Sequence, residues 1–190
     1  MSGRSSAPAL LLGIARLAGF RADGWELIPG TRQAFLRSVP PLLALPVLSG
    51  LWSTLRGGAM SIGPIDLLAA LVAALAPAVL SEALARRWGR EAGWLRYAVA
   101  FNWCQFAVVL GGSALVSLAI GTAADGPPRA SAAGYALLAT ALYALVLQWS
   151  LARGGLDLGR LRAVAFTLFV NAGTGLLVFG PTLIAEGAAR

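Results

Sequence analysis

The sequence predicts an all-α fold, a polytopic transmembrane helical bundle of about five spans. Of its 190 residues, 58% are hydrophobic and only 12% are charged, whereas roughly a quarter of the residues of a soluble domain are charged. Residues 97–120 carry no charge and are long enough to cross a bilayer as a helix. Two apolar segments of similar length precede this stretch and two follow it. The expected spans are residues 35–53, 65–84, 97–120, 131–152 and 163–184.

Residues 1–34 precede the first span and contain a short amphipathic segment, residues 7–20. Its apolar side chains recur at helical spacing, which predicts a helix that lies in the headgroup plane of the membrane. A cleaved signal peptide with Arg4 as its basic start is the alternative. Arg16 and Arg21 directly after the apolar run, without a clear small-x-small cleavage site, favour the retained helix. The residues expected near one face of this helix are Leu10, Leu11, Ile14, Leu17 and Ala18.

Prolines interrupt the first two spans. Pro40 and Pro41 lie in the first span and Pro77 in the second, and a proline inside a helix removes a backbone donor and bends the chain. Glu82 lies near the end of the second span, four residues before Arg86, a spacing that predicts an exposed ion pair on one helix. A buried carboxylate that carries protons is the alternative.

Small residues predict where the last three spans approach other helices, because they let two backbones come close together. In the fourth and fifth spans, small or polar residues recur every four positions and so share one helical face. Pro181 is expected to end the fifth span. The small-residue faces are Gly111, Gly112, Ser113 and Ser117 in the third span, Ala132, Ala136, Thr140 and Ala144 in the fourth, and Ala163, Thr167, Asn171 and Gly175 in the fifth.

The arginines predict the orientation, because basic residues are retained on the cytoplasmic side. Five arginines lie in residues 1–37. The four segments between the spans then contain one, four, one and three arginines in turn, and the segment after the last span contains one. This alternation predicts a cytoplasmic N-terminal segment, residues 1–34, and a short periplasmic tail, residues 185–190. The use of arginine without lysine, with abundant alanine and glycine, is typical of a GC-rich bacterial genome. A bacterial inner membrane is therefore the expected location.

Polar side chains at depth in the spans form the candidate functional site. Asn102 and Gln105 lie one turn apart in the third span, and Asn171 lies in the fifth. An amide in hydrocarbon without a partner costs on the order of a few kcal/mol, so each should face protein or water. One interpretation is a clamp in which an amide of the third span meets a polar side chain of the fourth or fifth, and the other is a polar path for a solute. The candidate residues are Asn102, Gln105, Asn171, Thr167 and Gln148.

The composition argues against catalysis and against a metal or cofactor. The chain has no histidine and one cysteine, Cys104, which excludes His/Cys zinc sites, Ser-His-Asp triads and His-ligated haem. The nucleotide-binding pattern G-x-x-x-x-G-K-[ST] and the H-E-x-x-H and G-x-S-x-G motifs are also absent. We therefore expect no catalytic residue, no metal site and no cofactor.

The net charge of +7 predicts contact with anionic lipid headgroups, with no nucleic acid as a partner. The arginines lie between apolar spans, where they meet headgroups and set the orientation. Trp88 and Trp94 interleave with the arginines of the second loop, a pattern more typical of a membrane surface than of RNA binding. The expected basic cytoplasmic surface consists of Arg86, Arg87, Arg90 and Arg96.

Two short motifs carry a resemblance. An aromatic-Gly-Trp-like element, residues 20–25, leads into the first span, and Ala100-Phe101-Asn102-Trp103, followed by Gln105, opens the third. They resemble a family of small, uncharacterised, chiefly alphaproteobacterial inner-membrane proteins with five spans, and the likeness covers most of residues 20–184. The layout is also similar to that of Yip1-domain proteins, which are linked to membrane trafficking and shaping. The resemblance implies no established activity.

These observations together predict a non-enzymatic integral inner-membrane protein, an interaction, accessory or membrane-organising module. Its expected partner is another membrane protein or a second copy of the chain. The alternative is a small solute permease or channel subunit with an amide-lined site at mid-membrane.

Overall fold

The computed structural model describes residues 7–55, 64–124 and 126–188, with side-chain positions for residues 7–45, 68–124 and 126–181. These residues are helical almost throughout and contain no strand, which confirms the all-α fold. Arg4, Arg56 and Arg190, which contribute to the arginine count, lie outside them. The elements are α1 (Ala7–Ala18), the 3-10 helix η1 (Ala22–Leu27), α2 (Arg32–Leu55), α3 (Pro64–Arg87), α4 (Glu91–Thr122), α5 (Pro127–Gly155) and α6 (Arg160–Ala188).

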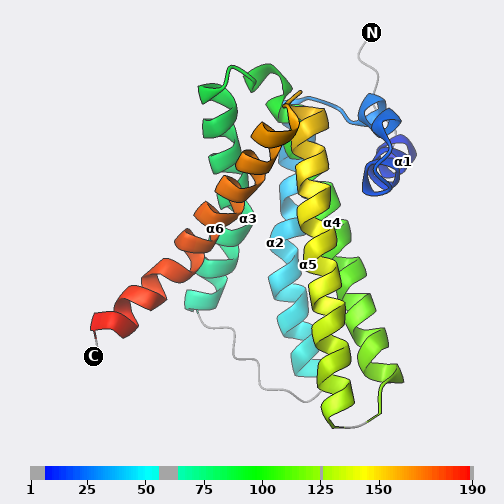
Figure 1. Cartoon of the computed structure of the whole chain (residues 1–190), viewed down its shortest axis with the longest axis vertical. Coiled ribbons are helices and arrows are strands. Elements are labelled where there is room, and N and C mark those ends of the chain that lie inside the picture. The colour runs from blue at the N-terminus through cyan, green and yellow to red at the C-terminus, as the bar shows by residue number, and fades with distance from the viewer. Residues whose placement is uncertain (1–6, 56–63, 125, 189–190) are drawn as a thin grey trace.

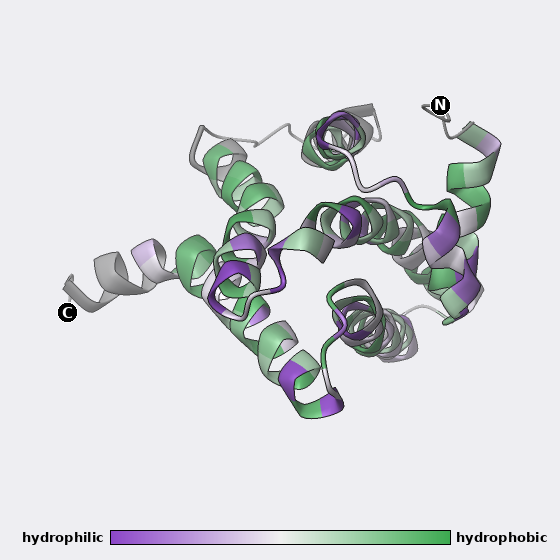
Figure 2. Cartoon of the chain, turned by 90° about the horizontal axis from the view of Figure 1, so that it is seen from above, coloured by the Kyte–Doolittle hydropathy of each residue, from purple (hydrophilic) through white to green (hydrophobic). Residues whose placement is uncertain are grey.

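Four helices of the described residues are long and apolar enough to cross a membrane, and they lie in α3, α4, α5 and α6. Each contains one of the last four expected spans and extends past both of its ends. Helix α2 contains the first expected span, residues 35–53, and its side chains are described up to Leu45. Seen from above, the helices are mostly hydrophobic along their length, and hydrophilic segments gather near their ends (Figure 2).

Pro181, the expected end of the fifth span, does not end the helix. Pro181 lies inside α6, which continues to Ala188, so residues 185–188 of the expected tail are helical. Pro77 likewise lies inside α3. Membrane helices tolerate proline because neighbouring helices and small local adjustments satisfy the backbone groups that it frees.

The helices form two groups. Helix α4 packs against α5 and α2, and α3 packs against α6. The groups meet at one end of the bundle, where α5 also contacts α6, and α3 and α6 lean away from the others toward the opposite end (Figure 1). The end where they meet carries the loops between α3 and α4 and between α5 and α6, and arginines lie at the helix ends that adjoin these loops.

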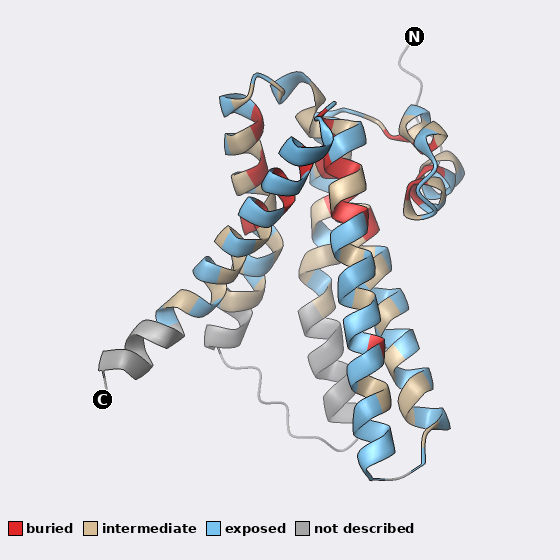
Figure 3. Cartoon of the chain, viewed as in Figure 1, coloured by how far each residue is buried: buried red, intermediate tan, exposed pale blue. Residues whose placement is uncertain are grey.

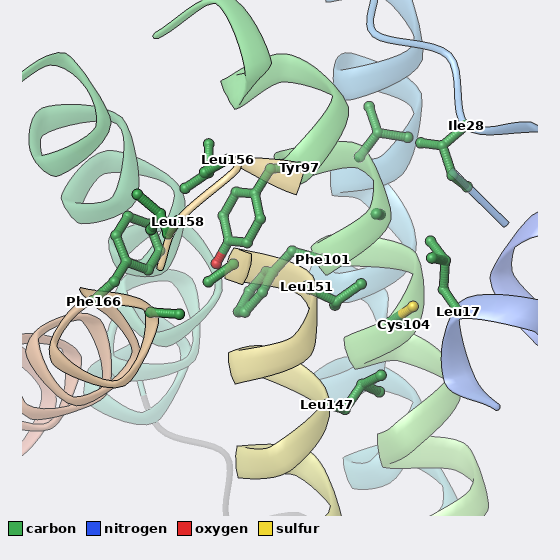
Figure 4. Packing of buried hydrophobic residues seen from close by; sticks show 14 of the residues in the cluster. Leu17, Ile28, Tyr97, Phe101, Cys104, Leu147, Leu151, Leu156, Leu158 and Phe166 are labelled. Atoms are coloured by element: carbon green, nitrogen blue, oxygen red, sulfur yellow. The ribbon is translucent and has the colours of Figure 1, made fainter. Parts of the chain in front are cut away.

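Buried residues gather in the half of the bundle next to these two loops (Figure 3). In α4 they lie between Tyr97 and Cys104, and in α5 most lie within residues 147–152. Phe166 of α6 is fully buried, with its ring centroid 5.5 Å from that of Tyr97 and 6.0 Å from that of Trp88 (Figure 4). We call this the packed half and the remainder of the bundle the open half.

The N-terminal segment packs against the packed half. Ile14 and Leu17 of α1 are buried, and Leu17 lies beside Cys104 of α4 (Figure 4). Leu11, expected on the same face, is 62% exposed. The buried stripe follows Leu10, Ile14 and Leu17, and Leu11 falls to its side.

Glycines allow the N-terminal segment and α4 to approach the end of α5 closely. Trp25 of η1 lies across Gly154 and Gly155, where added Cβ atoms would stand 2.5 Å from its Nε1 and 2.7 Å from its Cη2. A Cβ on Gly93 of α4 would stand 2.6 Å from the carbonyl oxygen of Gly155. Side chains at these positions would force the elements apart, so the glycines fix the contact between α4, α5 and η1.

Candidate intramembrane polar site

Asn102 joins α4 to α2. Its side chain is 3% exposed, and its Nδ2 donates a hydrogen bond of 2.9 Å to the Oγ of Ser38. The Ser38 hydroxyl in turn donates to the carbonyl oxygen of Phe35 at 2.7 Å. The Ser38 hydroxyl thus donates one hydrogen bond and accepts another, and both partners are protein groups.

Asn171 joins α6 to α5. Its Nδ2 donates to the Oε1 of Gln148 at 2.6 Å and to the carbonyl oxygen of Thr167, one turn earlier, at 2.8 Å. Gln148 is 8% exposed and Asn171 is half-buried, so this bond is partly shielded between two helices. A direct bond between two amides at such depth removes the cost of leaving them unpaired in hydrocarbon.

The candidate residues thus fall into two separate groups. Asn171, Gln148 and Thr167 lie together on α5 and α6, whereas Asn102 turns to Ser38 on α2 and does not meet them. Gln105 is half-buried and belongs to neither group. Amides do not ionise, so the arrangement can bind through hydrogen bonds and orient helices, but it supplies no proton donor or acceptor for acid–base chemistry.

Two threonine hydroxyls lie on α6 near Asn171. The Oγ1 atoms of Thr167 and Thr174 are buried and have no hydrogen-bond partner in the structure, and the two residues lie one turn before and one turn after Asn171. A buried hydroxyl without a partner is unusual. Each of these hydroxyls keeps a donor and an acceptor available near Asn171.

Sequence reasoning did not identify Ser38, nor the bond of 3.1 Å in which Trp94 Nε1 of α4 donates to Ser81 Oγ of α3. Ser38 and Ser81 are each 1% exposed. A serine in a helix usually bonds the preceding turn of its own backbone, and both do so here. Nothing in the sequence therefore distinguishes the serines that also accept a bond from another helix.

The expected basic surface is divided among several contacts. Arg86 pairs with Glu82 of its own helix at 2.6 Å, as the spacing predicted, and the side chains are 69% and 35% exposed. Arg90 pairs with Asp157, beyond the end of α5, at 3.1 Å. Arg87 and Arg96 are exposed, and the Arg96 side chain passes over Gly30.

Within the part of the chain that the structure describes, no group of three or more His, Cys, Asp or Glu side chains is placed to hold a metal ion. Comparison of the chain with protein-family models, curated proteins and solved structures finds no match.

Proposed function

We propose that the chain is a non-enzymatic accessory or membrane-organising protein of a bacterial inner membrane, with an architecture like that of Yip1-domain proteins. Its partners are another membrane protein or a second copy of the chain. The hydrogen-bonded pairs Asn102–Ser38 and Asn171–Gln148 act as clamps that fix α4 to α2 and α6 to α5. The arginine-rich end of the bundle faces the headgroups of the cytoplasmic leaflet.

One observation supports this proposal above the others. The deep amides bond directly to protein acceptors, Asn102 to Ser38 at 2.9 Å and Asn171 to Gln148 at 2.6 Å. A path for a solute needs polar groups that are free to exchange partners with the passing molecule. Here the Nδ2 group of each asparagine donates its hydrogen bond to a protein acceptor instead.

Replacement of Asn102 and Asn171 by leucine tests the clamp. We expect each change to lower the free energy of unfolding by roughly 0.6 to 1.7 kcal/mol, which are the average and the maximum measured for hydrogen bonds between membrane helices. Gln105→Leu is the matched control and should leave stability nearly unchanged, because Gln105 belongs to neither pair. Unchanged stability in both asparagine variants would argue against clamps.

A small permease or channel subunit is the second candidate, and the unpartnered hydroxyls of Thr167 and Thr174 beside Asn171 favour it. Osmotic swelling of liposomes that contain the purified chain, with glycerol and glycine as solutes, separates the two candidates. The accessory function predicts swelling equal to that of empty liposomes. A permease predicts faster swelling that Asn171→Leu abolishes while the protein stays folded.

The orientation has its own test. A cysteine introduced at Arg190 should react with a membrane-impermeant maleimide in intact spheroplasts, because the proposal places the C-terminus in the periplasm. Cys104 is 1% exposed and gives little background labelling. Labelling that requires lysis would place the C-terminus in the cytoplasm and reverse both surfaces.

A further inference from the structure

A cavity of about 610 Å³ lies between the end of α1 and the turn that joins α5 to α6. Three arginines line it, Arg21 from the N-terminal segment, Arg153 from α5 and Arg160 from the start of α6. Among the described residues its lining includes one carboxylate, Asp157, which already accepts a bond of 3.1 Å from Arg90. The lining carries three positive charges and one negative charge, so the cavity suits an anion.

Two of the three guanidinium groups have no carboxylate partner among the described residues. Arg21 shares Asp23 with Arg16, at 2.9 and 3.4 Å. Arg153 instead stacks over the ring of Trp149 at 5.8 Å, and no described ion pair involves Arg160. A guanidinium presents several N–H groups in one plane, which matches the oxygens of a phosphate group.

The backbone is unusual on both sides of this cavity. Phe20 and Asp157 line it, and they are the non-glycine residues of the described chain with a left-handed backbone, at φ 59° and 49°. Helix α3 ends with the same capping pattern and uses Gly89, at φ 67°. Phe20 and Asp157 occupy the left-handed position that ends a helix, so the chain turns beside the cavity at both residues.

A second cavity, of about 470 Å³, lies deeper between α1, α4 and α5. Most of its lining is apolar or small. Its two hydroxyl groups are already bonded to carbonyl oxygens, Tyr143 to Ala18 and Thr140 to Ala136, each at 2.8 Å. The lining includes Ala18, Cys104, Ala107, Val108, Gly111 and Tyr143.

The two cavities follow one another along α5. Ser150 lines the first and Tyr143 the second, and seven residues of helix separate them by about 10 Å, with both on the same face. The headgroup layer of one leaflet is roughly 5 to 8 Å thick. When the arginine cavity lies among headgroups, the apolar cavity therefore lies among acyl chains. Phe20 lines the first cavity and Tyr143 the second, and their ring centroids lie 5.8 Å apart, so the two cavities adjoin at this pair of rings.

We propose that the two cavities form one binding site for an anionic phospholipid. Arg21, Arg153 and Arg160 bind its phosphate group, and the apolar cavity takes an acyl chain. The inference rests on the proposed function in one respect, the location of the arginine-rich end at a headgroup layer. It gives the accessory protein a defined lipid partner in addition to general contact with the bilayer.

Binding to the full chain, purified in a nonionic detergent, tests the phosphate part. Native mass spectrometry should show saturable binding of phosphatidylglycerol. Binding of phosphatidylcholine with the same acyl chains should be about tenfold weaker, because its choline group brings a positive charge close to the three arginines. Arg153→Gln and Arg160→Gln should each weaken the binding of phosphatidylglycerol about tenfold, because each removes charge-assisted hydrogen bonds. Arg87→Gln, an exposed arginine at the same end of the bundle, is the matched control and should bind like the parent protein.

A variant of the apolar cavity tests the chain part. Gly111 lines this cavity with open space around it, so Gly111→Leu should fill the cavity and weaken the binding of both lipids. Gly121→Leu, with equally open surroundings on the same helix, is the control. If Gly111→Leu does not elute as a folded, helical protein, Ala107→Leu replaces it.

Three results would overturn the proposal: equal affinity for the two lipids, tight binding of glycerol phosphate alone, or arginine variants that bind like Arg87→Gln. Tight binding of glycerol phosphate would identify a soluble phosphate as the ligand in place of a lipid. These measurements depend neither on orientation nor on solute flux. Failure of the lipid site and failure of the proposed function are therefore distinguishable.

Discussion

The packed half and the open half of the bundle consist of the same helices but have different surroundings. In α5, residues 147 and 148 are buried, whereas Leu137, Leu138 and Leu142 of the same helix are 59%, 57% and 55% exposed. Lipid is as apolar as leucine, so no hydrophobic gain draws these open-half side chains into a core. Stability must therefore come from shape complementarity and hydrogen bonds, and both are concentrated in the packed half.

Truncation of Phe166 should give the largest difference between the halves. Phe166→Ala leaves a cavity between Trp88 and Tyr97, and we expect it to lower the free energy of unfolding by about 2 kcal/mol. The packing contacts around the cavity are lost, whereas transfer of the ring from protein to lipid costs nothing. Phe169→Ala, 53% exposed on the same helix, should cost far less. Unfolding in mixed detergent micelles measures both. Equal losses would mean that the halves are packed alike.

Glycine replacement should change stability in opposite directions in the two halves. Gly93→Ala places a Cβ against the carbonyl oxygen of Gly155, and the required separation of α4 from α5 should cost about 1 to 3 kcal/mol. Gly121→Ala meets nothing within 4 Å, and it should stabilise the helix slightly, by up to about 1 kcal/mol. Thermal unfolding midpoints of the two variants in one detergent check this. A tolerated Gly93→Ala would contradict the close approach.

The exposed ion pair should give the smallest effect. Glu82→Gln removes the contact with Arg86, and we expect a loss of about 0.5 kcal/mol or less, because both side chains reach solvent. High salt should remove the difference between the variant and the parent protein. A loss as large as that of Phe166→Ala would show that charge, and not packing, stabilises this end of the bundle.

The extent of the helices was predictable because membrane thickness fixes the length of an apolar run, and each expected span lies inside one observed helix. The hydrogen-bond partners of the amides were not predictable. The sequence places Asn102 on a face of its helix, but it does not indicate that α2, with Ser38, lies against that face. The arginine cavity was missed for a similar reason. Arg21 and Arg160 are distant in sequence, and their proximity depends on how η1 docks on the end of α5.

The bond from the Tyr143 hydroxyl to the carbonyl oxygen of Ala18 joins residues 125 positions apart. A ribosome adds about 5 to 20 residues per second, so about 6 to 25 seconds pass between the synthesis of the two partners. During this interval α1 has no α5 to bind, and Trp25 has no Gly154 or Gly155 to cover. Helix α1 thus leaves the ribosome before α5 but reaches its final place only after it, and its docking reports that membrane insertion of α5 is complete.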